Sequence, residues 1–305
     1  MILCASEIRL GLGGGDVHAL VRLAADAGFD GIAAGARLVV GDLPGLVAAA
    51  AGAGLTVPAV AAPLGPAVPG PGRRLPHLAA ADAEERAAAA ALAEATWEAA
   101  APLGARLSVL DFGAVALGTA RAAVARAFER RELDEDEPGH KLLAAALAER
   151  RARSPAILDA CRYGLDRLLR AADRHGIVLA LELAADPWGA PSPREAASLV
   201  DGYRGAPLGV MWDPARLDAL AALGTAPPPA RQQALAAAAR LRRAAEAVGI
   251  DPGYLPGQGD PAGAVADDVK LPAGLDVVVT GRADSTAAEV TRAREAAAIA
   301  TRAAT

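Results

Sequence analysis

The chain has 305 residues, 53% of them hydrophobic, and a formal net charge of −5. An acidic balance without clustered Lys argues against a general affinity for nucleic acid or for an anionic membrane surface. No apolar stretch free of charge and Pro reaches the roughly 18 residues of a membrane span. The first residues run into a strand pattern without a basic region or cleavage site. We therefore expect a cytoplasmic protein with no membrane or nucleic-acid partner.

Strand and helix patterns alternate from one end of the chain to the other. Short apolar runs, expected as strands, occupy 2–5, 31–34, 55–61, 107–112, 177–183, 208–212, 244–250 and 275–280. Helical patterns occupy 16–27, 43–51, 79–101, 115–131, 155–174, 193–203, 214–223 and 286–303. Eight strand-helix units predict an α/β protein, a single (β/α)₈ barrel over residues 1–305, with an open doubly wound sheet as the alternative. The run 244–250 has as much helical as extended character.

Several helix ends have local signals. Asp16 is an expected N-cap, and Gly176 is an expected C-cap after His175. Ser154-Pro155 predicts a helix that begins there, with Ser as N-cap and Pro in the first turn. The segment 128–153 is charged and turn-forming, and we interpret it as an excursion after the fourth strand within the one domain.

Two apolar strand patterns end in a carboxylate, Glu182 in the first and Asp213 in the second. Carboxylates at the ends of buried strands are costly to desolvate unless a cation, a metal or several donors meet them. The strand period of two puts Glu182 on one face with Val178 and Ala180. Because active sites of such barrels lie at the C-terminal ends of the strands, both carboxylates are candidate site residues. Further polar residues at strand ends are Glu7, Asp111 and Asp251.

The stretch 165–182, Pro191-Ser-Pro-Arg-Glu and Leu208-Gly-Val-Met-Trp-Asp-Pro together resemble the xylose isomerase-like TIM barrels. That family includes sugar and sugar-phosphate isomerases and epimerases. Weaker matches occur from Ala25 onward, before the fourth strand and at Leu255. The resemblance implies a small sugar-like ligand and a site centred on Glu182 and Asp213.

The resemblance also implies a divalent metal site of a Glu, an Asp, a His and a second Glu on strands five to eight. Oxygen-rich sites with one imidazole suit Mn²⁺ or Mg²⁺. Glu182 and Asp213 match the first two positions as metal ligands. The other two ligands would fall near Val248 and at Val279 or Thr280. No His stands near Val248, no acid occupies Val279 or Thr280, and Arg216 replaces a second family His. We therefore expect a degenerate metal site.

Arg216 offers a different way to neutralise the two carboxylates, because a guanidinium can fork across carboxylate oxygens where a metal would otherwise sit. On this hypothesis Glu182, Asp213, Arg216 and Asp111 form the catalytic set. Trp188, in the loop after the fifth strand, is a candidate to stack on a sugar ring, with Glu7 and Asp251 as further substrate-binding candidates. A buried ion pair that only ties the strands together is the competing interpretation of Glu182 and Asp213.

Three functions remain open at this point. The first is a sugar or sugar-phosphate isomerase or epimerase that uses Mn²⁺ or Mg²⁺. The second is a non-catalytic barrel that acts as a binding or scaffold protein. The third is a metal-free acid-base enzyme that uses Arg216. The Ala-rich helices would permit packing as a homodimer.

Overall fold

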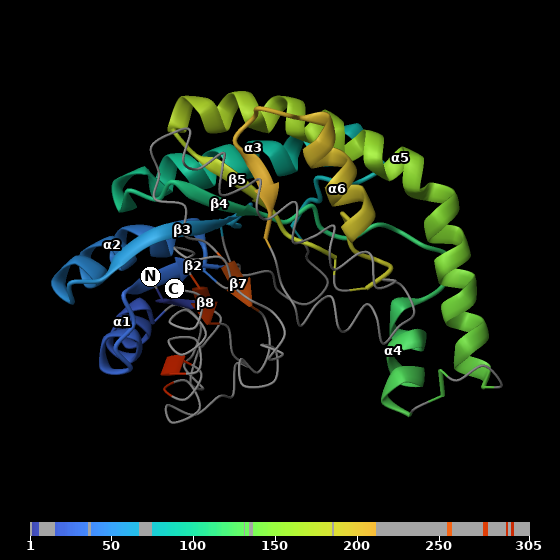
Figure 1. Ribbon diagram of the computed structural model, residues 1–305, viewed down its shortest axis with the longest axis horizontal. Helices are drawn as coiled ribbons and strands as arrows, with labels where there is room; N and C mark the ends of the chain where they lie inside the picture. Colours follow the sequence, from blue (N-terminus) through green and yellow to red (C-terminus); the bar gives the residue numbers. More distant parts are fainter. Residues whose placement is uncertain are drawn as a thin grey trace.

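A parallel sheet of eight strands forms the centre of the computed structural model (Figure 1). The strands are β1 (Ile2–Ala5), β2 (Gly31–Ala34), β3 (Thr56–Ala62), β4 (Leu107–Leu110), β5 (Val178–Leu181), β6 (Leu208–Val210), β7 (Leu255–Gly257) and β8 (Val277–Val279). Neighbours follow the order β6-β5-β4-β3-β2-β1-β8-β7. The pairing of β1 with both β2 and β8 is that of a (β/α)₈ barrel, so the doubly wound alternative is wrong.

The structure describes most of the first two thirds of the chain and short pieces of the rest. The described residues are 2–5, 16–35, 38–66, 75–130, 132–133, 137–184, 186–211, 255–257, 277–279, 291 and 294–295. The predicted helices 214–223 and 286–303 lie outside them, apart from Thr291, Arg294 and Glu295.

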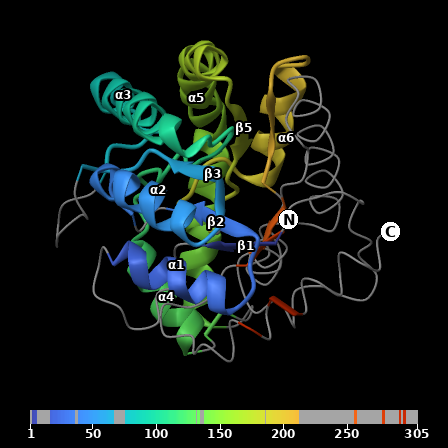
Figure 2. The ribbon, with the colours of Figure 1, turned by 90° about the vertical axis from the view of Figure 1, so that its left-hand side faces the viewer.

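The described helices pack against strands β2, β3, β5 and β6 (Figure 2). They are α1 (Val17–Asp26), α2 (Leu43–Gly52), α3 (Ala83–Ala100), α4 (Arg121–Glu129), α5 (Pro138–His175) and α6 (Pro193–Gly202), with short 3₁₀ turns at Val40–Asp42 and Ala101–Leu103. Two of the three predicted caps, Asp16 and Gly176, are confirmed. Asp16 Oδ1 accepts from the Ala19 N–H at 2.9 Å, and Gly176 ends α5 in the left-handed conformation with φ 63°, where glycine has no Cβ penalty.

The core has two layers because successive strand residues face opposite sides of the sheet. Ile32, Val60, Leu110 and Leu179 belong to the large cluster beneath the helices. Their alternates form a separate cluster on the other face of the same strands, here called the inner cluster: Ala33, Ala59, Leu107, Val109, Val178, Ala180 and Met211. An apolar layer on the inner face is typical of a barrel filled by side chains.

The predicted helix start at Ser154 is wrong. Helix α5 does not begin at Ser154 but runs without interruption over 38 residues, with Pro155 in its interior. Figure 1 shows it arching from α4, near which it begins, to α3, and a proline inside a helix removes one backbone hydrogen bond and favours bending. Most of the segment 128–153, expected as a turn-forming excursion, is therefore helical, because α5 covers it from Pro138 onward. The seventh strand is Leu255–Gly257 beside β8, whereas 244–250 lies outside the described residues.

Tertiary contacts explain why α5 continues through Pro155. Residues on both sides of it are buried, among them Ala146 before the proline and Cys161 and Leu165 after it. This packing compensates for one missing backbone hydrogen bond. Within the described residues, no helix has the length and apolarity of a membrane span.

Candidate active site at the ends of β4 and β5

Asp111 and Glu182 are neighbours at the C-terminal ends of adjacent strands. Leu110 pairs with Leu181 in the β4–β5 register, and the Glu182 N–H continues the ladder to Leu110 O at 3.0 Å. Asp111 and Glu182 are the next residues of the two chains after this last pair. Strand alternation puts both residues on the face of the inner cluster. Asp111 is exposed and Glu182 partly buried, as expected at the opening of a barrel.

Asp111 is held by a tight turn. Its Oδ1 accepts from the Gly113 N–H at 2.7 Å, and Gly113 has φ +81°, a conformation that side-chain-bearing residues rarely adopt. The ring of His77 packs on Gly113 so closely that a Cβ added there would lie 2.6 Å from His77 Cγ and Cδ2. His77 Nδ1 lies 3.0 Å from Ala114 O. The loop after β3 thus supports the turn that orients Asp111.

The loops after β4 and β5 are joined by their own backbone ladder. Ala114 and Gly189 form an antiparallel bridge, and the Ala190 N–H donates to Gly113 O at 3.0 Å. The Val115 N–H donates to Trp188 O at 2.7 Å. We call residues 183–191 the β5 loop; it begins directly after Glu182 and is closed by the Ala184 N–H to Pro191 O at 2.9 Å. Both candidate carboxylates therefore lie where these two joined loops begin.

Trp188 is buried between the β5 loop and helices α4 and α5. This burial contradicts the prediction that its ring stacks on a sugar. Its side chain is only 6% exposed and packs with Val124, Leu143 and Ala146 of α4 and α5. Its Nε1–H donates to Thr119 O at 3.0 Å. Trp188 therefore anchors the β5 loop, and neither face of its ring is open to a ligand. Trp97, on α3, is fully buried.

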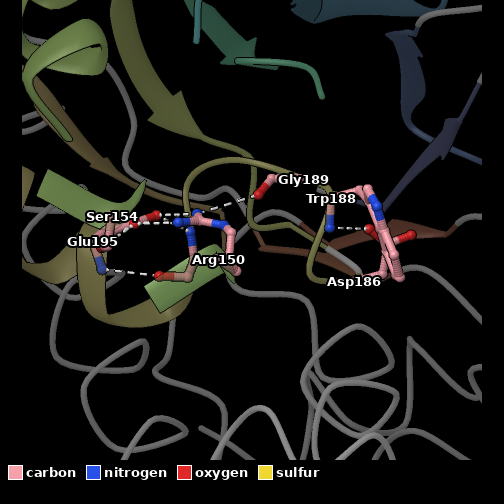
Figure 3. Close-up of polar contacts among 7 residues, drawn as sticks. Arg150, Ser154, Asp186, Trp188, Gly189 and Glu195 are labelled. Carbon is pink, nitrogen blue, oxygen red and sulfur yellow. Dashed lines mark hydrogen bonds and ion pairs between the residues drawn. The ribbon is translucent and has the colours of Figure 1, made fainter. Parts of the chain in front are cut away.

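A buried ion pair fastens the β5 loop to α5 and α6 (Figure 3). The Arg150 guanidinium donates to both oxygens of Glu195, at 2.8 and 2.6 Å, and to Gly189 O at 3.4 Å. Ser154 Oγ donates to Glu195 Oε1 at 2.6 Å, and the Ser192 N–H donates to Oε2 at 2.9 Å. Arg150 and Glu195 are 8% and 4% exposed. The carboxylate thus has four donors, as a buried charge requires.

The pKa of Glu195 follows from these contacts. Burial by itself raises the pKa of this carboxyl, but the hydrogen bonds and charge of Arg150, with Ser154 and the Ser192 N–H, outweigh burial and lower it below the usual 4.5. A carboxyl with a lowered folded-state pKa contributes stability above its unfolded pKa and loses it as the pH falls through the folded value.

We therefore expect acid to remove the contribution of Glu195. The free energy of unfolding of the wild type should exceed that of Glu195→Gln by a constant amount above about pH 4.5, and the difference should shrink at lower pH. Urea denaturation at a series of pH values measures this. The exposed carboxylate variant Asp159→Asn serves as the control, and a gap for Glu195→Gln that widens on acidification would contradict the lowered pKa.

The other predicted site residues, Glu7, Asp213, Arg216 and Asp251, lie outside the described residues. In the part of the chain that is described, no three His, Cys, Asp or Glu side chains gather as a candidate metal site. Asp111 and Glu182 supply oxygens of the kind that Mn²⁺ or Mg²⁺ prefers. The sequence has no His after His175, so strands β6 to β8 provide no imidazole. The imidazole of the four-ligand set that the resemblance implies therefore has no counterpart after His175 in the sequence.

Sequence reasoning missed His77, Arg150 and Glu195 as residues that support the site. A local signal for Glu195 was present, because Ser192-Pro-Arg-Glu195 has the pattern of a capping box and forms one at the start of α6, with its N3 carboxylate oriented toward the helix N-terminus. Nothing local pairs Arg150 with a residue 45 positions away.

Comparison with known proteins places the chain in a family. Residues 21–219 match the model of the xylose isomerase-like TIM barrels, and the chain belongs to that family. No curated protein matches it.

Solved structures of sugar epimerases share the fold. A D-psicose 3-epimerase from Clostridium cellulolyticum H10 is 13% identical, with a TM-score of 0.59 over 100% of this chain and 99% of that one. An L-ribulose 3-epimerase is 13% identical, with a TM-score of 0.60 over 99% and 95%. A 3-keto-D-glucoside 4-epimerase from E. coli is 13% identical, with a TM-score of 0.54 over 99% and 100%. At this identity the likeness defines the fold and leaves the reaction to the residues of the site.

Proposed function

We propose that this protein is a sugar or sugar-phosphate isomerase or epimerase whose proton transfers use Asp111 and Glu182. The observation that supports the proposal is the adjacency of these carboxylates on the inner face of the barrel, at the ends of β4 and β5. The family and the epimerases that share its fold supply the substrate class. The cytoplasmic location and homodimer expected from the sequence stay predictions.

The chemistry needs a base and an acid close to one carbon. In a ketose, a carboxylate removes the proton from the carbon next to the carbonyl, and the C–H electron pair moves into an enediolate. Return of the proton to the neighbouring carbon isomerises the sugar, and delivery to the opposite face of the same carbon epimerises it. Two carboxylates side by side can divide these roles. The negative charge on the enediolate oxygen calls for a cation, for which Arg216 is the candidate within this chain.

Solvent hydrogen exchange tests the proposal even while the product is unidentified. Ketoses, aldoses and their phosphates are incubated with the protein in D₂O, and deuterium at the carbon beside the carbonyl is followed by NMR. We expect exchange with at least one sugar, and a loss of about 100-fold or more for Glu182→Gln and for Asp111→Asn. Asp159→Asn, on the exposed surface of α5, should match the wild type.

The same assay separates the alternatives. Exchange that disappears in chelator and returns with Mn²⁺ or Mg²⁺ would identify a metal-dependent isomerase. Exchange that survives chelator but is lost in Arg216→Ala would identify the metal-free enzyme. A sugar that binds without any exchange would make the protein a binding barrel and reject the proposed activity.

A further inference from the structure

The buried Arg150–Glu195 pair connects to the candidate site through a short chain of contacts. Arg150 Nη2 donates to Gly189 O. Gly189 bridges Ala114, and Ala190 donates to Gly113 O. The Gly113 N–H in turn holds Asp111 Oδ1 at 2.7 Å. These four contacts lead from the Arg150 guanidinium on α5 to the Asp111 carboxylate after β4.

The β5 loop is tightly packed against itself and against its neighbours. A Cβ added at Gly189 would lie 2.8 Å from the Cβ of Ala184, so the backbone of the loop already touches itself two residues after Glu182. Trp188 fills the space between this loop and helices α4 and α5, and Arg121 pairs with Asp186 at 2.5 Å. Gly189 is therefore held between the Arg150 guanidinium and Ala184 of the same loop.

Packing alone would not require an ion pair here. A buried charge pair costs desolvation energy, and apolar residues of similar volume often give a protein of equal stability. A guanidinium that donates to both oxygens of a carboxylate has its remaining N–H groups fixed in direction, and an apolar contact gives no such direction. In this protein the second nitrogen, Nη2, points both to Glu195 and to the loop carbonyl of Gly189 (Figure 3).

We propose that Arg150 and Glu195 are positioning residues for the reaction. They hold the β5 loop and, through Gly113, fix the Asp111 carboxylate beside Glu182. The positioning role in the reaction rests on the proposed function. The control of the loops after β4 and β5 does not depend on it.

Hydrogen exchange followed by mass spectrometry tests the control of these two loops. Arg150→Lys keeps the charge but loses the fork to Glu195 and the contact with Gly189. We expect amides of the β5 loop and of residues 112–118 to exchange at least about tenfold faster, with α1 and β2 unchanged. Glu195→Gln is a second variant should Arg150→Lys fail to fold. Arg162→Lys, from an exposed pair on the same helix, is the matched control. Wild-type exchange in both loops of a folded variant would overturn the proposal.

The catalytic role is tested by comparing the changes in kcat and in KM in the assay of deuterium incorporation into the sugar. A mispositioned Asp111 should lower kcat about tenfold in Arg150→Lys and leave KM within about twofold, because the substrate still binds while proton transfer is misaligned. Unchanged kcat despite faster loop exchange would overturn the positioning role. If the wild type acts on no sugar, the proposed function fails. The hydrogen exchange of the two loops then still decides whether Arg150 and Glu195 hold them in place.

Discussion

Replacing Arg150 by Met is expected to lower the free energy of unfolding by about 3–5 kcal/mol. The substitution leaves the Glu195 carboxylate 4% exposed without its counter-charge, and the hydrogen bonds of Ser154 and Ser192 do not compensate for a buried unpaired charge. Met has nearly the length of the Arg stem, so lost packing contributes little. Guanidinium chloride denaturation, monitored by circular dichroism, measures the change.

Two further variants show whether burial of the charge is the cause. Arg162→Met removes an arginine from the same helix that pairs with Asp159 at 3.2 Å, with both side chains about half exposed or more, and should cost less than about 1 kcal/mol. Arg150→Met combined with Glu195→Met removes both buried charges and should be more stable than Arg150→Met alone. A double variant less stable than the single would show that charge burial is not the origin of the loss.

Substitution of Gly139 by Ala is expected to destabilise the protein by about 3 kcal/mol, the upper end of the range for overpacking. A Cβ at this position in the first turn of α5 would lie 2.3 Å from the carbonyl oxygen of Glu132 and 2.6 Å from the Cβ of Ala127. Neither neighbour is the flexible end of a side chain, so α4, α5 or the backbone at Glu132 has to shift. The shift would open the cluster of Trp188, Val124 and Leu143.

Gly164 of the same helix provides the matched control. A Cβ there would lie 3.8 Å from side-chain atoms of Leu78 and Phe112, an ordinary van der Waals distance. Gly164→Ala should therefore stabilise the protein by about 0.5–1 kcal/mol through helix propensity. Thermal and denaturant unfolding of the two variants compares them directly. Equal effects of the two substitutions would mean that the close approach of α4 and α5 does not limit stability.

The alternation of apolar runs with helical patterns determined the architecture. Seven of the eight predicted strands coincide with observed ones to within a few residues, because strands buried on both faces are apolar throughout and local in sequence. The face shared by Val178 and Ala180 is confirmed by the inner cluster. The same period places Asp111 and Glu182 together once the β4–β5 register is known. Asp16 and Gly176 fixed helix ends through their own side-chain and backbone preferences.

Tertiary structure decided how the site is supported, since the contacts involved join residues far apart in the chain. Ser154-Pro155 has the local pattern of a helix start, yet Ser154 donates to Glu195, 41 residues away, and α5 continues through both. Trp188 has an exposed-loop context in the sequence, and only the arrival of α4 and α5 buries it. Local propensities amount to a fraction of a kcal/mol per residue, whereas burial of an aromatic ring or pairing of a buried charge amounts to several. Where the two disagree, the long-range contact determines the outcome.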